Sequence, residues 1–194
     1  MTSIAPIPDA GLRMSREEYR LWAEQQPKGR FERIEGVVVA MAPERAHHAD
    51  RKALVWLALR QAVAGAGLPC HVYPDGMTVE VDDSDFEPDV TLHCGPPLPG
   101  NAIAVPEPVV LVEVLSPSTE GGSTRGDDLT RKLEAYFRIS SVRHYLIFWA
   151  DRPRAIHYRR RGDGPGIDTR IVAEGAIRLD PPGISITMEE IYAG

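Results

Sequence analysis

The sequence predicts a single α/β domain, and three observations lead to this fold class. The chain has 194 residues, a normal length for one domain with a hydrophobic core of ordinary size. Amphipathic helical patterns alternate with short strand patterns along it. Between Pro108 and Pro117 lies a β-branched, apolar segment, Val109 to Leu115, which is typical of a central strand buried on both faces.

Composition and charge exclude several classes of protein. No apolar run is long enough to cross a bilayer, and the N-terminus lacks the pattern of a secretory signal, so we expect a cytoplasmic protein. Cys70 and Cys94 fit no zinc-finger spacing; reduced thiols are favoured there, although a disulfide between them stays open. The net charge of −6 argues against a protein that coats nucleic acid, but not against an enzyme that acts on it.

The N-terminal region predicts an arm followed by a helix. Residues 1–13 are rich in proline, glycine and small residues, so we expect a flexible arm and a single domain over residues 14–194. Ser15 and Glu18 have the spacing of a capping box, in which each side chain bonds the other's backbone N–H. The helix that they begin should end near Glu24.

Residues 31–41 predict a strand with a bend or bulge at Gly36. Side chains alternate between the two sides of a strand, so Glu32 and Glu35 lie on opposite sides. Only one of these glutamates can therefore face a given site, unless a bulge changes the register.

The middle of the chain predicts a long helix and a strand pair. The helix should begin at His47 or His48 and continue to about Ala64, because apolar residues form a broad stripe along it. Alternating residues 77–81 predict a strand, and after an acidic turn the strand Pro88–Cys94 should return beside it.

The C-terminal half predicts one more long helix and several strands. A helix capped by Asp127 or Asp128 should extend to about Ile139, following a polar, flexible segment after Ser116. Strands are expected at residues 142–149, 155–160 and 169–173, and a second capping box at Thr187 and Glu190.

Glu113 is out of place in the central strand, because it is a carboxylate within an otherwise apolar run. Burying an unpaired charge costs several kcal/mol or more. Such a residue is retained where a cation, a metal ion or a proton satisfies it, which makes Glu113 a candidate site residue. The competing interpretation is a solvated strand end, or an ion pair with a lysine or arginine of the core.

The order of the elements places further charged residues near Glu113. Asp89 lies on the preceding strand and Lys132 on the following helix. Two carboxylates near the ends of adjacent strands can hold a hard divalent cation such as Mg²⁺. A lysine at the same place could position or deprotonate an attacking water, or stabilise charge on a phosphate. Together these residues predict metal-assisted phosphodiester hydrolysis.

Two motifs stand out along the chain. Residues 112–119 read Val-Glu-Val-Leu-Ser-Pro-Ser-Thr, and Asp128, Lys132 and Tyr136 form a row with a spacing of four. With Pro88-Asp89-Val90 and the segment from Ile34 to Val38, these motifs resemble the Uma-type putative restriction endonucleases of the PD-(D/E)XK nuclease superfamily. The resemblance covers nearly the whole chain and implies a restriction-endonuclease-like fold, in which a central mixed β-sheet is flanked by helices.

The resemblance also implies an activity and its residues. It implies an endonuclease that hydrolyses nucleic acid, DNA in the first instance, with Mg²⁺ or Mn²⁺ as cofactor. Asp89 and Glu113 would be the metal ligands and Lys132 the catalytic lysine. A glutamate of the first strand would be a further acidic catalytic residue, and both Glu32 and Glu35 stay candidates, with Glu32 preferred.

The chain departs from the general superfamily pattern at one position. Leu115 stands two residues after Glu113, where the superfamily has a lysine, so Lys132 would supply that charge from a helix instead. If Lys132 were only a solvated residue at a helix edge, catalysis would be in doubt while the fold would not. His48 matches a histidine that is frequent in the family, although a packing role is the more common one for such a residue.

A different class of function also stays open. The acidic net charge is compatible with a non-catalytic module that retains the nuclease fold and binds nucleic acid or protein. A local basic patch could meet phosphates, and an exposed strand pair is an equally good interpretation of its residues, Arg152, Arg154, Arg159, Arg160 and Arg161. Because this hairpin and the N-terminal arm would need cover, we expect a homodimer.

Overall fold

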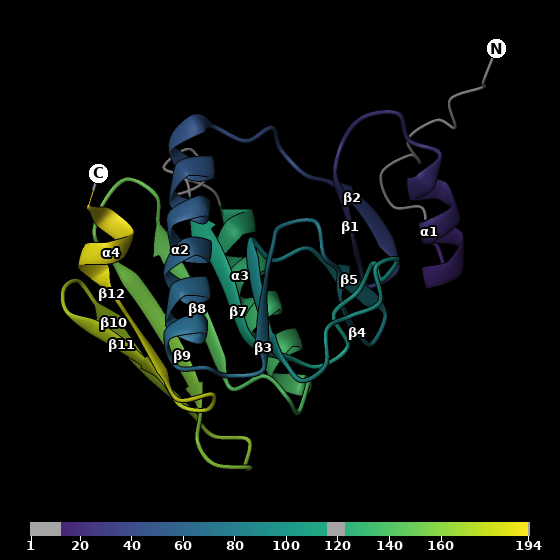
Figure 1. Cartoon of the computed structure of the whole chain (residues 1–194). Helices are drawn as coiled ribbons and strands as arrows, with labels where there is room; N and C mark the ends of the chain where they lie inside the picture. Colours follow the sequence, from purple (N-terminus) through teal and green to yellow (C-terminus); the bar gives the residue numbers. More distant parts are fainter. Residues whose placement is uncertain (1–12, 116–122, 194) are drawn as a thin grey trace.

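A computed structural model of the chain, which describes residues 13–115 and 123–193, has a six-stranded mixed sheet at its centre (Figure 1). The one parallel pair among these strands is β7–β8, and the other four pairs are antiparallel. The α/β class predicted from the sequence is therefore confirmed. In spatial order the strands are β10 (Ile167–Val172), β9 (Ala155–Arg160), β8 (His144–Trp149), β7 (Pro108–Leu115), β6 (Val90–Cys94) and β3 (Cys70–Pro74).

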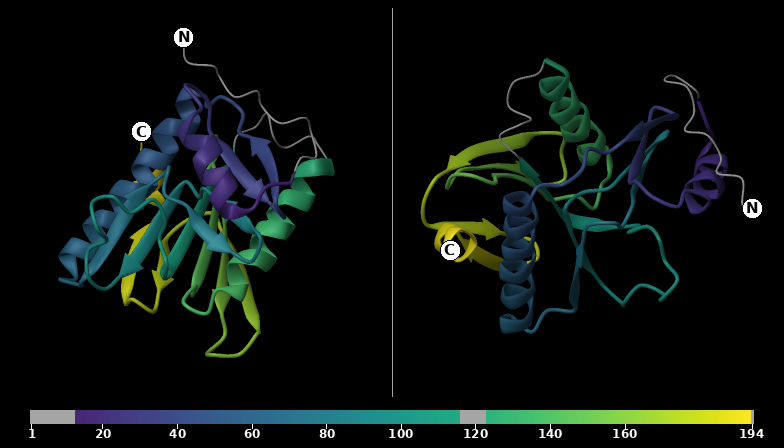
Figure 2. Two further views of the ribbon diagram at one scale, coloured as in Figure 1. Left: turned by 90° about the vertical axis from the view of Figure 1, so that its right-hand side faces the viewer. Right: turned by 90° about the horizontal axis from the view of Figure 1, so that it is seen from above.

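Strand β7 is buried on both faces, as its apolar sequence predicts. Val110, Val112 and Val114 pack with helix α2 (Ala46–Gly65), the ribbon β11–β12 (Ala176–Leu179 and Ile184–Thr187) and helix α4 (Met188–Tyr192). Leu111 and Leu115 face the other way, toward helix α3 (Ser123–Arg138). Figure 2 shows α2 and α4 on one side of the sheet and α3 on the other. By alternation, Glu113 lies on the side of α3.

A second sheet of four strands adjoins the α3 face. Its order is β2 (Val37–Ala40), β1 (Phe31–Ile34), β5 (Ser84–Phe86) and β4 (Val79–Val81). The single bent strand expected over residues 31–41 is wrong, because the chain reverses at Glu35 and Gly36 and forms the hairpin β1–β2. Both residues have positive φ, 50° and 81°, the backbone that a tight two-residue hairpin turn requires. The expected pairing of β6 with residues 77–81 is also wrong: β5 takes that place, and β6 joins the central sheet between β3 and β7.

Arg33 anchors the second sheet from inside. Its side chain is only 1% exposed, and its Nε donates to Oδ2 of Asp85 at 2.5 Å. Its Nη1 also pairs with Asp83 and donates to the carbonyl of Met14. Helix α1 (Arg16–Glu24) is held to the same Asp85 through Arg16. Since Arg33 occupies one side of β1, its neighbour Glu32 is directed to the opposite side.

The helices begin close to the positions predicted from the sequence, with one exception. The capping box of Ser15 and Glu18 is present at α1, and that of Thr187 is present at α4. Helix α3 begins at Ser123, earlier than the predicted cap at Asp127 or Asp128. The predicted turn at residues 116–118, the start of the polar segment after it and the arm up to residue 12 lie outside the described residues. None of the helices in the described ranges is long and apolar enough to cross a membrane.

The preference for reduced cysteines is wrong. Cys70 on β3 lies directly opposite Cys94 on β6, and the two form a disulfide bond. The sequence pattern does not predict strand β3, so it offers no register that would place these cysteines together. The sequence pattern does not predict the ribbon β11–β12 either, whose short strands alternate exposed and buried residues.

Candidate active site

Asp89 and Glu113 lie on the same face of the central sheet. The β6–β7 register pairs Val90 with Val112, so the next step along the ladder places Asp89 opposite Glu113. Asp89 is buried, and its Oδ2 accepts a 2.6 Å hydrogen bond from the backbone N–H of Val114. Two carboxylates therefore project from adjacent strands into one cleft.

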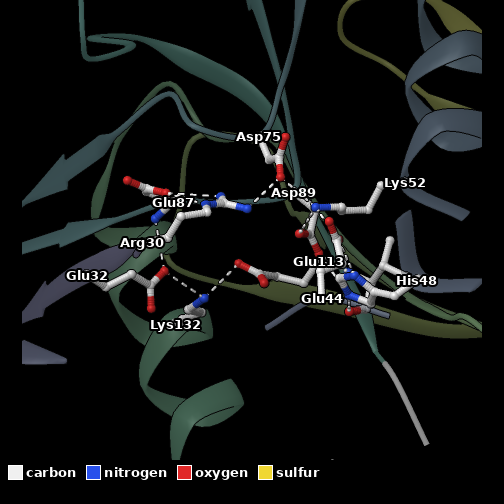
Figure 3. Close-up of polar contacts among 11 residues, drawn as sticks. Arg30, Glu32, Glu44, His48, Lys52, Asp75, Glu87, Asp89, Glu113 and Lys132 are labelled. Carbon is white, nitrogen blue, oxygen red and sulfur yellow. Dashed lines mark hydrogen bonds and ion pairs between the residues drawn. The ribbon is translucent and has the colours of Figure 1, made fainter. Parts of the chain in front are cut away.

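Lys132 connects the two sheets within this cleft. Its Nζ lies 3.0 Å from Oε1 of Glu113 on β7 and 3.0 Å from Oε1 of Glu32 on β1. Figure 3 shows its ammonium group between the two glutamates. One helical turn further along α3, the hydroxyl of Tyr136 donates to the same Oε1 of Glu113 at 3.1 Å. Two members of the row with a spacing of four, Lys132 and Tyr136, thus point at Glu113, and both are buried.

The structure separates the two candidate glutamates of the first strand. Glu32 is buried and its Oε1 also accepts from the backbone N–H of Glu87 at 2.9 Å. Glu35 lies in the β1–β2 turn with its side chain 68% exposed, and its nearest cation, Arg131, is 3.9 Å away. Four of the five candidate site residues therefore meet in the cleft, Glu32, Asp89, Glu113 and Lys132, whereas Glu35 lies outside it.

The other half of the cleft is a network that the sequence did not indicate as a unit. His48 on α2 bridges Glu44 and the carbonyl of Val114, each at 2.6 Å, and its Nε2 is 3.8 Å from Asp89. The ligand atoms of Glu44, His48 and Asp89 lie within 4.8 Å of one another. The one sign of this network in the sequence is the spacing of four between Glu44 and His48. This sign is weak, because Glu44 precedes the helix.

Lys52 and Arg30 supply the cations of this half. Lys52 is buried, contacts Glu44, and lies 2.5 Å from Asp75 and 3.6 Å from Asp89. Arg30 lies between Asp75 and Glu87, at 2.6 and 3.0 Å. Neither cation is predicted from the sequence, because each lies far along the chain from most of the carboxylates that it contacts.

Negative charge is in excess in the cleft. The carboxylates that line the cleft or pair with its cations are those of Glu32, Glu44, Asp75, Glu87, Asp89, Glu113 and Asp128 (Figure 3 labels all but Asp128). The cations of the lining are fewer, Arg30, Arg45, Lys52 and Lys132, together with His48. Burial raises the pKa of Glu113 to about 8; Lys132 lowers this pKa and the charges of Asp89 and Glu32 raise it, but burial is the largest effect. Burial also raises the pKa of Asp89, despite the hydrogen bond from Val114.

The surrounding carboxylates keep Lys132 protonated. Burial by itself would lower its pKa, but Glu113 and Glu32 more than offset that effect, and the pKa stays well above the ordinary value. Lys132 is therefore an ammonium ion near neutral pH. The cleft around these groups has a volume of about 670 Å³, and Val39 and Ala40 of strand β2, with Met41 after it, form part of its wall.

The sequence of the chain matches that of a known protein family. The family described as "Uma2: Putative restriction endonuclease" matches residues 16–189. The chain belongs to this family. Its Uma2 segment includes every candidate site residue named above. The family relationship predicted from the sequence motifs is thereby confirmed.

One curated protein and one solved structure are similar to this Uma2 chain. It is 26% identical over 201 residues to the uncharacterized protein slr1290 of Synechocystis sp. strain PCC 6803, covering 98% of this chain and 95% of that protein. A crystal structure described as "a putative nuclease belonging to DUF820", from Anabaena variabilis, matches with a TM-score of 0.69 and 13% identity over 93% of this chain and 98% of that one. At that identity the match shows a shared nuclease-like fold.

Proposed function

We propose that this protein is a metal-dependent endonuclease that hydrolyses phosphodiester bonds of nucleic acid, DNA in the first instance. The observation that carries the proposal is that the buried Asp89 and Lys132 and the largely buried Glu113 meet in one cleft of a Uma2 chain. Membership of this family supports a nuclease-like function. The metal, the substrate and the roles of the residues are the proposed part.

The residues of the cleft fit a hard divalent cation. Asp89 and Glu113 offer carboxylate oxygens, which Mg²⁺ and Mn²⁺ prefer as ligands. Burial raises the pKa of Glu113 to about 8, and a cation bound at its carboxylate would favour the charged form. In our proposal these two residues hold the metal ion, and Glu44 and His48 adjoin it through Asp89. When bound, the ion would polarise the scissile phosphate and lower the pKa of a bound water.

The raised pKa of Lys132 favours one role for it over the other. A lysine that stays protonated can stabilise negative charge that develops on the phosphate, but it does not remove a proton from water. Glu32 and Tyr136 would be positioning residues. Glu32 holds the ammonium group of Lys132 from the opposite sheet, and Tyr136 fixes the carboxylate of Glu113.

A cleavage assay with matched variants tests the proposal. Wild type, Asp89→Asn and Lys132→Gln, with Glu35→Gln as control, are incubated with plasmid, linear, single-stranded and RNA substrates in Mg²⁺, Mn²⁺ or EDTA. We expect cutting that requires metal, is lost in the first two variants and is retained in Glu35→Gln. Cutting that persists in Asp89→Asn and Lys132→Gln would show that the activity comes from another site or a contaminant.

The alternative is a non-catalytic module that retains the fold and binds nucleic acid or protein. No metal-dependent cutting on any substrate, together with no effect of Mn²⁺ on the melting temperature of wild type relative to Asp89→Asn, would favour it.

A homodimer and a cytoplasmic location are also part of the proposal. Reduced cysteines no longer support the cytoplasmic location, because Cys70 and Cys94 are paired.

A further inference from the structure

A second concave surface lies between the central sheet and the β11–β12 ribbon. It has a volume of about 280 Å³, and three arginines line it, Arg159 on β9, Arg170 on β10 and Arg178 on β11. His157 and Asp168 complete its charged or titratable lining. We call this surface the arginine hollow. By the same measure of volume a water molecule needs about 10–15 Å³, so the hollow has room for an oxyanion with several waters.

The guanidinium groups of these three arginines have no close partner in the part of the chain that the structure describes, although the charge of Asp168 acts on Arg159 and Arg170. None of them makes a hydrogen bond or an ion pair, although all three are exposed enough to reach one. Their neighbours in the predicted basic patch are engaged. Arg160 turns inward and donates to three backbone carbonyls, and Arg161 pairs with Asp168 at 2.6 Å.

The fold brings these arginines together by register. Arg159 and His157 point to the same side of β9, and their β10 partners are Asp168 and Arg170, which point to that side too. Arg178 comes from the ribbon that packs over this side. The fold therefore holds three positive charges from three different strands near one another. No local sequence pattern predicts this grouping.

The electrostatics of the hollow are positive even though the chain is acidic. Asp168 is the one carboxylate of its lining, and Arg161 already pairs with it. The pKa of the neighbouring His157 agrees with a positive field at this surface. Burial lowers this pKa most, and the charges of Arg159 and Arg170 lower it further, to about 4. With a net charge of −6 for the chain, this positive field is local.

The hollow is separate from the candidate active site. Along β8, Arg159 lies beside His144 near the start of the strand, whereas Glu113 lies beside Ile147 near its end. The hollow lies on the face of the central sheet that α2 and the ribbon cover, whereas Glu113 and Lys132 lie on the face that α3 covers. Figure 2 shows α2 and α3 on opposite sides of the sheet.

We propose that the arginine hollow binds a phosphate group, separately from the cleft. The planar guanidinium presents two parallel N–H donors and matches the oxygens of phosphate, which makes unpaired arginines a suitable site for this anion. The phosphate can belong to the backbone of a nucleic acid, in which case the inference rests on the proposed function, or to a free phosphate compound, in which case it does not.

The first arm of the test uses inorganic pyrophosphate and no nucleic acid. Wild type is compared with the triple variant Arg159→Gln, Arg170→Gln, Arg178→Gln in EDTA at constant ionic strength. A second triple variant, Arg60→Gln, Arg138→Gln, Arg154→Gln, changes net charge equally at exposed arginines elsewhere. We expect pyrophosphate to raise the melting temperature of wild type and of the control, and not that of the hollow variant.

The second arm uses a fluorescent 24-base-pair DNA duplex, again in EDTA so that no cleavage occurs. If the duplex backbone occupies the hollow, the hollow variant should bind it more weakly than the control. The slope of log K against log salt should also become less steep, by about 0.9 for each phosphate that the variant no longer neutralises.

The outcomes separate the two sources and the two proposals. An effect in both arms supports the hollow with nucleic acid as its ligand, and an effect of pyrophosphate alone supports it with a free phosphate compound. If the hollow variant behaves as the control does in both arms, the proposal is overturned. Neither arm measures cleavage, so failure of the nuclease proposal would appear separately, in the assay with Asp89→Asn and Lys132→Gln.

Discussion

The ammonium group of Lys132 lies 3.0 Å from a carboxylate oxygen of Glu113, and Glu32 is equally close to it on the other side. One cation thereby joins helix α3, the central sheet and the second sheet. All three side chains are largely removed from water, so their charges interact strongly and depend on one another. Replacing any one of these three residues should therefore change the stability or the activity of the protein measurably. The charge of the replaced residue decides the direction of the change.

Replacing Lys132 should destabilise the fold. In Lys132→Met the carboxylate of Glu32 stays buried without its cation, and Glu113 loses the ammonium group beside it. Breaking a buried pair in this way typically costs about 3–5 kcal/mol. Urea unfolding at pH 7 in EDTA measures the loss. The control, Lys28→Met, removes an exposed lysine and should change the free energy of unfolding by less than about 0.5 kcal/mol. Equal stability of the two variants would contradict the buried pairing.

Replacing Glu113 should have the opposite effect at alkaline pH. Its pKa in the folded protein is about 8, against 4.5 ordinarily, so the folded state holds a proton that the unfolded state releases. This group therefore lowers stability as pH rises from about 4.5 to about 8. Glu113→Gln keeps the shape without the charge, while Glu32 still pairs with Lys132. In EDTA at pH 8 we expect this variant to unfold at a higher urea concentration than wild type; a lower midpoint would refute the prediction.

The two glutamates of the first hairpin should differ in their effect on cleavage. Glu32→Gln weakens the positioning of Lys132, and removing such a supporting group typically costs roughly 10–100-fold in activity. We expect this decrease in kcat with KM nearly unchanged, because substrate binding does not need the pairing of Glu32 with Lys132. Glu35→Gln, in the exposed turn, should keep wild-type kcat. A kinetic comparison in which both variants lose activity equally would argue against the placement of Glu32.

The buried pair of His144 and His157 should make the protein sensitive to acid. Nδ1 of His144 is 2.8 Å from Nε2 of His157, and its Nε2 is 2.9 Å from the carbonyl of Pro181. Burial, with nearby positive charge, lowers their pKa values to about 3 and about 4. The unfolded chain takes up protons at these residues below about pH 6.5, so stability is full above that pH and falls as pH drops toward 4.

Urea unfolding at pH 7, 6 and 5 measures this dependence. Each histidine contributes up to about 1.4 kcal/mol per pH unit. The double variant His144→Gln, His157→Gln retains hydrogen-bonding groups and should show a clearly smaller fall in stability between pH 7 and 5. A slope as steep as that of wild type would assign the acid sensitivity to other groups.

Local sequence determined much of the fold. The central strand β7 was evident from its apolar run, and the caps of α1 and α4 from Ser15 and Thr187, because these signals depend on neighbouring residues alone. Glu113 was evident for the same reason, since a carboxylate in a buried strand conflicts with its immediate surroundings. The motifs around Asp89, Glu113 and Lys132 also sufficed to identify the family.

Only the tertiary structure decided which distant residues meet. The turn at Glu35 made two strands of one predicted strand and directed Glu32 into the cleft, and the pairing of β6 with β3 joined Cys70 to Cys94. The contacts of Lys52, Arg30 and the arginine hollow likewise join residues from separate elements. Strand register and sheet order set these contacts, and both depend on pairings over long sequence separations, which the pattern within any one segment does not encode.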